Sequence, residues 1–554
     1  MRLYLGTNFG HGSAVAAISE EGELLYAIEE GKLIGDKNTS RFPEEALSHV
    51  ASNIEGSVDI LAEGWNPWQR LIYKGIIRTV KYGLRDPTYF RDGFLKEWGR
   101  FCEGQPQFRH WERLFGPVRP VGHHLAHAYS LLPAGLPPRS LVSVSDTTAE
   151  CASISSYYFS GQEMIPITSS LFPHSIGAVF HQLAYHFGFQ GRTGPGKLMA
   201  LAAFGKPRFL EQLKQIAEVK QGIFKIDIKK FPAWKRDGSW QAFSASAPVE
   251  LRDAIKCALG TPTEGIDLAS SAQAWFTEMT WACITQSLDL ARKKMGIEIS
   301  HLGLAGGAAL NCRANGEFLL KSPSVGLDTI TVSPWSDDSG TAIGAAAWAL
   351  AQRGLIERIQ HSSPFLGTAA LPGLKVPDDA DIHAAAQCLV ARHVIALASG
   401  RFEFGPRALG GRCLLADPRR DELRQQLNRM KSRPEFMPMA PVVLEQDYSR
   451  YFQGKGSRHM AWTVLAKETA RCEIPAAVHC DGHSRVQLLA SGDAPLLERV
   501  LQEFKRETGH GVLLLTSLNG TEEAIPSDLE RAEAVAYRLG AAGILSDAGW
   551  IVFE

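Results

Sequence analysis

The chain has 554 residues, 45% hydrophobic and 21% charged, a composition that predicts a soluble globular protein with more than one core. Its 58 Lys and Arg residues balance 59 Asp and Glu residues, so charge does not favour nucleic acid or an anionic membrane as partner, and a small-molecule substrate fits better. The nine cysteines include no C-x-x-C pair, and we find neither a signal peptide nor a bilayer-spanning segment, so we expect a cytoplasmic protein.

The N-terminal segment predicts three strands joined by short turns. Apolar runs cover Leu3 to Asn8, Ala14 to Ser19 and Glu23 to Ile28, and the first two flank the glycine loop Phe9 to Ser13. Such a loop makes either a hairpin turn or a cradle of backbone N–H groups for phosphate. His11 within the loop favours ligand binding, because an imidazole can donate to a phosphoryl or carboxamide oxygen.

Two histidines stand four apart in the apolar segment Val121 to Ala128. If this segment is helical, His123 and His127 share one face, where both imidazoles could bind a divalent metal. The alternative is a structural pair, packed and hydrogen-bonded in the core.

A second strand, polar loop and strand follow, at Leu141 to Asp146 and Ala152 to Phe159. The repeated pattern predicts two related subdomains. Downstream, an apolar stripe at helical spacing predicts a long helix that starts at Asp267, as N-cap, and ends near Gly296.

Glycine clusters mark further ligand candidates. Gly306 and Gly307 follow a short strand and permit close backbone approach, and Lys197 follows another cluster, where it is either a phosphate ligand or a solvated lysine. Asp338 precedes a small-residue helix, Thr341 to Ala351. Its carboxylate is either the N-cap of this helix or a ligand to a metal held by the two histidines.

A stretch rich in Pro, Gly and small residues predicts a linker at 361–377, between domains at 1–360 and 378–554. The last domain mixes helices with apolar runs, which predicts an α/β fold. These runs are Val394 to Ala398, Val486 to Ala490, Val512 to Thr516 and Trp550 to Phe553.

The C-terminal part is also rich in arginines and neutral hydrogen-bonding residues, which suit a phosphorylated substrate. Those that stand out are Arg401, Arg407, Arg412, Arg419, Arg420, Asn428, Lys431, Arg433, His479, Asp481, Arg485, Ser517 and Asn519.

Together these motifs resemble the O-carbamoyltransferase family of nodulation factor and antibiotic biosynthesis, and the resemblance spans nearly the whole chain. The motifs that carry it are Leu5-Gly6 with His11, Glu29-Glu30, His123-His124-x-x-His127-Ala128, Gly196-Lys197-x-Met199, Gly306-Gly307-x-x-Leu310-Asn311, Asp338-x-Gly340, Glu403-Phe404-Gly405-Pro406-Arg407-Ala408-Leu409-Gly410 and Ser517-Leu518-Asn519.

The resemblance implies an α/β protein of two parts. The first is a duplicated actin-like, sugar-kinase-like domain similar to the tRNA threonylcarbamoyl transferase, and the second is a YrdC-like domain. In that family the C-terminal domain makes carbamoyl adenylate from carbamoyl phosphate and ATP, and the N-terminal domain transfers the carbamoyl group to a hydroxyl. We therefore expect ATP with Mg²⁺, carbamoyl phosphate, a divalent metal such as Fe²⁺ and a small-molecule acceptor, in a monomer or homodimer.

The expected site residues fall into three groups. The resemblance assigns the metal to His123, His127, Asp146 and Asp338. We expect the cofactor nucleotide near Lys197, Gly306, Gly307, Asn311 and Arg407. Catalysis is expected from His11, Lys431, Arg433, Arg485, Ser517 and Asn519, where cations offset the charge of the substrates and the last two hold the carbamoyl group.

Three departures from the family pattern bear on these expectations. The chain has Gly12 where the family usually has Asp, Thr147 where a glycine follows the aspartate, and Met437 where an arginine is expected. Two alternatives therefore stay open: an actin-like ATPase or small-molecule kinase, and a catalytically degenerate binding protein. The sequence leaves the acceptor open among nucleosides, aminoglycosides, macrolides and β-lactams.

Overall fold

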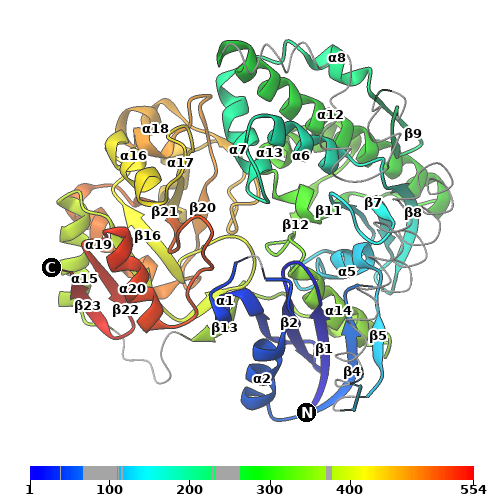
Figure 1. Cartoon of the computed structure of the whole chain (residues 1–554), viewed down its shortest axis with the longest axis horizontal. Coiled ribbons are helices and arrows are strands. Elements are labelled where there is room, and N and C mark those ends of the chain that lie inside the picture. Colours follow the sequence, from blue (N-terminus) through cyan, green and yellow to red (C-terminus); the bar gives the residue numbers. More distant parts are fainter. Residues whose placement is uncertain are drawn as a thin grey trace, which may run out of the picture. The chain divides into compact units, whose positions relative to one another are not determined.

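The computed structural model describes residues 1–37, 39–65, 116–227, 262–369 and 377–553, with a few single residues between these ranges. The chain forms two compact units, drawn in Figure 1. Unit 1 comprises residues 1–9, 16–24 and 54–362, and unit 2 comprises residues 10–15, 25–53 and 363–554. Part of the predicted linker, residues 370–376, lies outside the described residues.

The N-terminal part of the chain forms two five-stranded sheets. The first has the order β3-β2-β1-β4-β5 and the second the order β8-β7-β6-β11-β12. Their strands are β1 (Arg2–Asn8), β2 (Ala14–Ser19), β3 (Leu24–Glu29), β4 (Ser57–Glu63), β5 (Val118–Pro120), β6 (Ser140–Ser145), β7 (Ala152–Phe159), β8 (Met164–Leu171), β11 (His301–Ala305) and β12 (Thr329–Val332).

The two sheets share one topology. β1 pairs in parallel with β4, and β4 with β5; likewise β6 pairs in parallel with β11, and β11 with β12. Three strands consecutive in the chain therefore lead into two parallel strands in each sheet. This repeat confirms the duplication that the sequence predicts.

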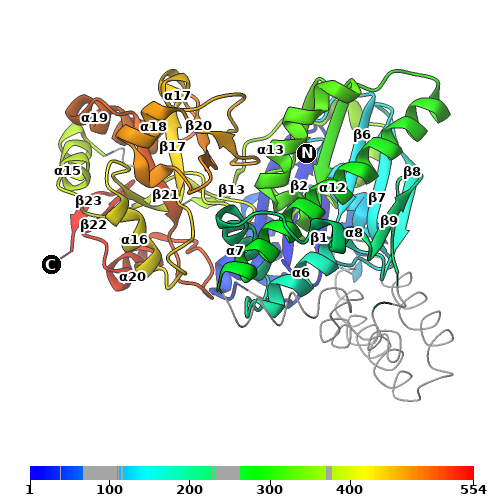
Figure 2. The ribbon, with the colours of Figure 1, turned by 90° about the horizontal axis from the view of Figure 1, so that it is seen from above.

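The main helices described in unit 1 are α5 (His123–Tyr129), α6 (Ile176–His186), α7 (Gly194–Leu201), α12 (Pro262–Met295), α13 (Cys312–Lys321) and α14 (Gly340–Ala351). Figure 2 shows α12 beside the second sheet, where its apolar side chains join those of β6 and β11 in one core. The prediction of Asp267 as its N-cap is wrong, because α12 begins at Pro262. The Asp267 carboxylate instead accepts a hydrogen bond from the Lys206 backbone N–H at 2.7 Å.

Close backbone packing fixes α14 against both α5 and β1. A Cβ atom at Gly344 would lie 1.6 Å from the backbone oxygen of Ala126, and one at Gly6 would lie 1.9 Å from that of Ala342. Only glycine permits such approaches without a shift of the backbone. These contacts matter for function because Ala126 lies between the two histidines of α5 and α14 follows Asp338.

Unit 2 is built on a seven-stranded sheet with the order β20-β17-β21-β16-β14-β22-β23. The strands are β14 (Ile395–Ala398), β16 (Arg412–Ala416), β17 (Ala440–Leu444), β20 (Gln487–Leu489), β21 (Val512–Ser517), β22 (Gly543–Ser546) and β23 (Gly549–Val552). Its main helices are α15 (Asp379–Val390), α16 (Asp421–Met430), α17 (Glu445–Tyr451), α19 (Pro495–Thr508) and α20 (Leu529–Leu539). α15 and α19 lie side by side in Figures 1 and 2, and their apolar faces join the core of the sheet. This mixed architecture confirms the α/β class.

Unit 2 also contains an early part of the chain, with α1 (Glu30–Ile34) and α2 (Glu44–Asn53). The buried Lys32 donates to the backbone oxygens of Glu403 at 2.6 Å and Gly405 at 3.1 Å. Glu29 accepts from the Gly405 N–H at 2.7 Å and pairs with Lys32 at 2.9 Å. These bonds tie residues 25–53 to the loop after β15 (Arg401–Glu403).

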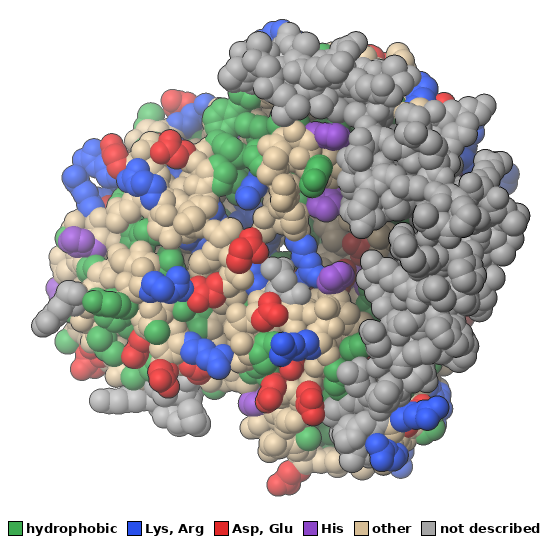
Figure 3. Space-filling model, viewed as in Figure 1, with side chains coloured by type: hydrophobic (Ala, Val, Ile, Leu, Met, Phe, Trp, Pro, Cys, Tyr) green, Lys and Arg blue, Asp and Glu red, His purple; other side chains and the backbone are tan. Residues whose placement is uncertain are grey.

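The surface reflects the balanced charge of the sequence. On the face in Figure 3, acidic and basic side chains are interspersed over the coloured residues, without an extended patch of one sign. No helix in the described ranges combines the length and apolar character needed to cross a bilayer. The cysteines described are free thiols.

Candidate functional site

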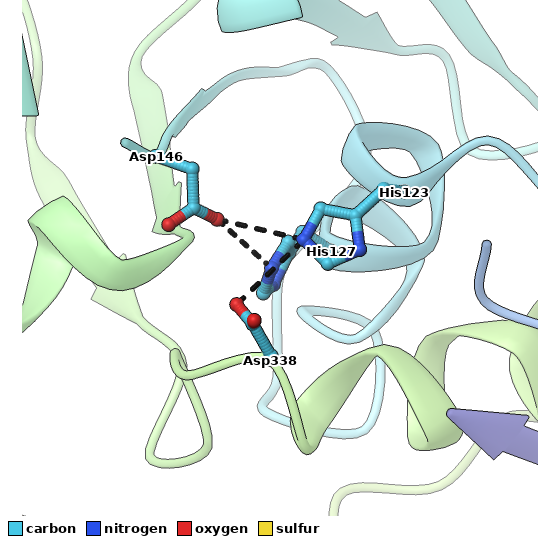
Figure 4. Close-up of side chains that lie close together, drawn as sticks. All are labelled: His123, His127, Asp146 and Asp338. Carbon is cyan, nitrogen blue, oxygen red and sulfur yellow. Dashed lines mark ion pairs between the residues drawn. The ribbon is translucent and has the colours of Figure 1, made fainter. Parts of the chain in front are cut away.

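Four side chains of unit 1 meet at a buried point (Figure 4). His123 and His127 come from α5, Asp146 follows β6, and Asp338 lies in the loop before α14. One ligand atom of each side chain lies within 4.8 Å of those of the other three. The structure therefore brings together all four residues that the resemblance assigns to a metal, and we call them the metal cluster.

The distances within this metal cluster are short. His127 Nε2 lies 3.2 Å from Asp146 Oδ2, and His123 Nε2 lies 3.7 Å from both Asp146 Oδ2 and Asp338 Oδ1. Ligand atoms about 2.0 to 2.2 Å from a common ion would be separated by roughly 3 Å or slightly more. The spacing of the four side chains thus suits one shared ion.

Buried polar atoms test whether an ion fits. His127 Nε2 and Asp146 Oδ2 are shielded from solvent and, apart from their ion pair with each other at 3.2 Å, have no well-aligned hydrogen bond to any described residue. An unsatisfied buried donor or acceptor costs roughly 1–3 kcal/mol. A divalent cation would satisfy both atoms, and two imidazoles with two carboxylates suit a first-row transition metal.

The metal cluster is also strongly coupled electrostatically. Burial alone would disfavour the imidazolium, but the carboxylates of Asp146 and Asp338 raise the pKa of His123 to about 10. Burial likewise opposes ionisation of Asp146, yet the neighbouring His123 and His127 hold its pKa below its ordinary value. The imidazoles and carboxylates of the metal cluster thus stabilise the charged forms of one another.

Asp338 does not cap α14. The N-cap position is Ser339, which makes no side-chain cap, whereas Asp338 Oδ1 faces His123. Of the two alternatives that the sequence left open for Asp338, the N-cap is wrong, and its carboxylate lies in the metal cluster.

Two residues that the sequence did not single out for this role orient the metal cluster. The buried Glu150 carboxylate accepts the His123 backbone N–H at 3.0 and 3.3 Å, and so caps α5, whose N-cap Gly122 has no side chain. Gly344 sets the approach of α14 to α5. Neither contact has a local sequence signal, because each depends on tertiary packing.

The residues expected around the nucleotide are divided between the units. Lys197, on α7, and the Gly306-Gly307 loop belong to unit 1. The exposed His11 lies on the turn between β1 and β2 and belongs to unit 2, as does the half-buried Arg407.

Gly307 and Asn311 also have structural contacts of their own. The Gly307 N–H donates to Asp146 Oδ1 at 3.1 Å, and a Cβ there would lie 2.8 Å from the same oxygen. Asn311 is the N-cap of α13, accepting from the Ala314 N–H at 3.0 Å, and its amide pairs with Gln273. A larger residue at Gly307 would therefore disturb Asp146 directly.

In unit 2 a second group of the expected residues comes together. Lys431, the C-cap of α16, donates through Nζ to Asn519 O at 2.7 Å and to Ser517 Oγ at 3.2 Å. Arg433 donates to Thr516 Oγ1 at 3.2 Å, and burial together with the nearby charge of Arg485 lowers the pKa of Arg433 to about 10. Five of the six expected catalytic residues, all except His11, thus belong to one group at the end of β21.

Lys37 is an additional cation here that our sequence analysis missed. Its Nζ donates to Thr521 O at 3.0 Å. Burial of the Lys431 amine and the charges of Arg433 and Lys37 lower the pKa of Lys431 well below its ordinary value. We call Lys37, Lys431, Arg433 and Arg485 the cation cluster. Lys37 lies almost 400 residues before Arg433, so no local pattern could connect them.

The glycine-rich block from Glu403 to Gly410 is largely structural in this unit. The buried Glu403 Oε1 accepts from the N–H groups of Leu409 at 2.8 Å and Gly411 at 2.5 Å, and so closes the loop. At the departure position Met437, the backbone oxygen accepts from Asn428 Nδ2 at 2.8 Å.

Comparison with known proteins gives these clusters a context. The chain matches the family model for the carbamoyltransferase N-terminus over residues 3–347 and that for the carbamoyltransferase C-terminus over residues 386–548. The chain belongs to the carbamoyltransferase family. The metal cluster lies in the N-terminal match, and Lys431, Arg433, Ser517 and Asn519 lie in the C-terminal match.

Relatives of this carbamoyltransferase are similar over most of their length. Nodulation protein NolNO of Sinorhizobium fredii is 30% identical, with 94% of this chain and 76% of the relative covered. The 3'-hydroxymethylcephem-O-carbamoyltransferase of Streptomyces clavuligerus is 27% identical, with 92% of this chain and 91% of the relative covered. Among solved structures, T. kodakarensis HypF has a TM-score of 0.36 at 14% identity, covering 64% of this chain and 49% of HypF.

Proposed function

We propose that this carbamoyltransferase carbamoylates a hydroxyl group of a small molecule, using carbamoyl phosphate and ATP through a carbamoyl-adenylate intermediate. The observation that carries the proposal is the presence of two different clusters: the metal cluster lies in the N-terminal match, and Lys431, Arg433 and Arg485 of the cation cluster lie in the C-terminal match. The S. clavuligerus relative, named for O-carbamoyl transfer to a hydroxymethyl group, supports a hydroxyl acceptor.

The proposed chemistry has two stages. In the first, water releases phosphate from carbamoyl phosphate, and the resulting carbamate attacks the α-phosphate of ATP to give carbamoyl adenylate and pyrophosphate. In the second, the acceptor hydroxyl attacks the carbamoyl carbon, the bond to AMP breaks, and the hydroxyl proton passes to a base. Both stages carry developing negative charge, which fixed cations and donors stabilise.

We assign the first stage to a YrdC-like domain at 378–554, where the cation cluster would offset the charge of ATP and of the carbamate. Ser517 and Asn519 offer hydroxyl and amide groups of the right size for a carbamoyl group, and they lie beside the cations. Residues 25–53 would take part, because Lys37 belongs to the same unit.

The second stage is assigned to an actin-like domain at 1–360, linked through 361–377. His123, His127, Asp146 and Asp338 would hold a divalent ion such as Fe²⁺, which when bound would polarise an oxygen as a Lewis acid. Lys197, Gly306, Gly307 and Asn311 would bind nucleotide with Mg²⁺.

Product analysis tests this function. The purified chain is incubated with ATP, carbamoyl phosphate and a panel of nucleosides, aminoglycosides, macrolides and β-lactams that carry hydroxyl groups. Mass spectrometry should find one acceptor heavier by one carbamoyl group, together with AMP and pyrophosphate. Formation of ADP and a phosphorylated acceptor would instead identify a kinase.

Synthetic carbamoyl adenylate then separates the two stages. Arg433→Ala should slow adenylate formation at low carbamoyl phosphate concentration by about tenfold or more and be rescued by added adenylate, whereas His127→Ala should not be rescued. Arg471→Ala, which removes an arginine that is about half exposed in the same unit, is the matched control and should behave as wild type. Equal rescue of the Arg433 and His127 variants would refute the two-stage assignment.

A further inference from the structure

The ammonium group of Lys431 is enclosed by a single turn of the chain that follows β21. Nζ donates to the backbone oxygen of Ser517, to Asn519 O at 2.7 Å, to Asn519 Oδ1 at 2.9 Å and to Ser517 Oγ at 3.2 Å. Only 1% of the Lys431 surface is exposed. An ammonium has three hydrogens, so these four protein acceptors already satisfy it.

The turn is bound to Lys431 from its other end as well. Thr521 Oγ1 donates to the backbone oxygen of Lys431 at 2.6 Å, and Ser517 Oγ donates to Asn519 Oδ1 at 2.6 Å. Asn519 Nδ2 completes the arrangement by donating to Glu523 O at 2.7 Å. Lys431 is therefore the residue through which the turn from 517 to 523 is attached to the end of α16.

The two neighbouring arginines differ from Lys431 in this respect. Within the described ranges, the guanidinium of Arg433 donates a single hydrogen bond, to Thr516 Oγ1, although it has five N–H donors. Arg485 makes none there, although its charge lowers the pKa of Arg433. A guanidinium matches phosphate oxygens with two parallel hydrogen bonds, so these two side chains have donors to offer an anion.

We propose that Lys431 is a positioning residue that fixes the Ser517–Asn519 turn, while Arg433 and Arg485 bind the phosphate groups. The proposal rests on the proposed function, because it assumes that Ser517 and Asn519 hold the carbamoyl group. It also divides the cation cluster by role: the buried Lys431 holds the turn in place, and the half-buried Arg433 and Arg485 bind the substrate.

The division predicts different kinetic defects. Loss of Lys431 releases the oxygens of the turn, so bound carbamoyl phosphate is held in fewer reactive orientations and kcat for adenylate formation falls by about two orders of magnitude. Loss of Arg433 removes a contact made already on binding, so KM for carbamoyl phosphate rises, by about tenfold or more.

The experiment compares Lys431→Met, which keeps the apolar stem, with Asn519→Ala, which removes acceptors from the opposite side, and with Arg433→Ala. Two measurements are made: amide hydrogen exchange of residues 517–521 in the ligand-free protein, and carbamoyl-phosphate-dependent exchange of pyrophosphate into ATP. Lys32→Met is the matched control, since Lys32 is a buried lysine that donates to backbone oxygens elsewhere in unit 2.

We expect faster amide exchange in the turn for Lys431→Met and Asn519→Ala, and unchanged exchange there for Arg433→Ala and Lys32→Met. The double variant of Lys431 and Asn519 should be no worse in kcat than Asn519→Ala alone, because the second change acts on a turn that is already released. An unchanged turn together with a raised KM in Lys431→Met would overturn the proposal and make Lys431 a phosphate ligand.

The two measurements also separate this proposal from the proposed function. If wild type shows no exchange of pyrophosphate that depends on carbamoyl phosphate, adenylate formation is refuted. The amide exchange of the ligand-free turn still decides whether Lys431 holds it.

Discussion

The metal cluster of unit 1 differs from the turn from 517 to 523 in unit 2, which we call the Lys431 turn because it encloses that ammonium. Both bring together side chains from distant parts of the chain, but their polar atoms find partners in different ways. In the metal cluster, His127 Nε2 and Asp146 Oδ2 are buried and, apart from their ion pair with each other, have no well-aligned hydrogen bond to any described residue. In the turn, the buried Lys431 ammonium is surrounded by four oxygens of the chain itself. The metal cluster leaves buried polar atoms that a bound ion would satisfy, whereas the Lys431 ammonium is satisfied by the protein alone.

This difference predicts which arrangement is sensitive to ligand. Unsatisfied buried groups persist at a cost of roughly 1–3 kcal/mol each, which a bound cation would offset. Metal binding should therefore stabilise unit 1, whereas the Lys431 turn should keep its structure with or without substrate.

The largest expected effect is the loss of metal on removal of one ligand. His127→Ala should reduce the metal content of the purified protein from about one ion per chain to nearly none, as measured by elemental analysis. Treatment with a chelator should lower the melting temperature of wild type but not that of this variant.

His301→Ala is the matched control, because His301 is a half-buried histidine of the same unit whose Nδ1 lies 2.7 Å from Thr329 Oγ1. It should retain the metal. Equal metal content in wild type and His127→Ala would show that the histidines are structural.

A smaller effect is expected one step away from the metal. Glu150→Gln keeps one oxygen to cap α5 but loses the charge and the second acceptor, so His123 is held less firmly. Metal affinity, measured by competition with a chromophoric chelator, should fall by about tenfold, the lower end for changes outside the ligand shell.

The exposed Glu163→Gln in the same unit should leave that affinity unchanged and serves as the control. A fall as large as that of His127→Ala would mean that Glu150 is itself a ligand, which contradicts its position at the start of α5.

The smallest effect tests how rigid the Lys431 turn is without ligand. Ser432, between Lys431 and Arg433, has a left-handed backbone with φ of 49°, which is unfavourable for a residue with a Cβ. Ser432→Gly should raise the free energy of unfolding of unit 2 by about 1 kcal/mol or less, since relief of strain is partly offset by unfolded-state entropy.

Ser432→Ala, which keeps the Cβ, should give no gain in thermal melting. Slower adenylate formation in Ser432→Gly would show that the positions of Lys431 and Arg433 depend on the strained residue between them. It would contradict the proposal that Lys431 alone fixes the turn.

Local pattern predicted most of the elements described. The alternating and continuous apolar runs placed β2 and β7 at their observed bounds, and small residues at helical spacing placed α5 and α14. The errors lie where tertiary contacts override local preference. Asp267 resembles an N-cap, but α12 starts at Pro262, and the Asp267 carboxylate accepts from the distant Lys206 N–H instead.

The candidate sites divide in the same way. His123 and His127 could be paired from the sequence, because residues four apart share a helix face whatever the fold. That Asp146 and Asp338 would meet them came from the family resemblance, and the packing that allows it, through Gly344 and Glu150, appears only in the structure.

By itself, the sequence determined the strands, the helices, the histidine pair and the family, because these depend on short-range periodicity and on ordered motifs. Only the tertiary structure decided that Lys431 is enclosed by the turn of Asn519, 88 residues later, and that Lys37 lies in the same cation cluster. It alone also grouped residues 25–53 with the C-terminal unit. Contacts between distant segments depend on how closely packed elements approach one another, and no local pattern of side chains encodes that distance.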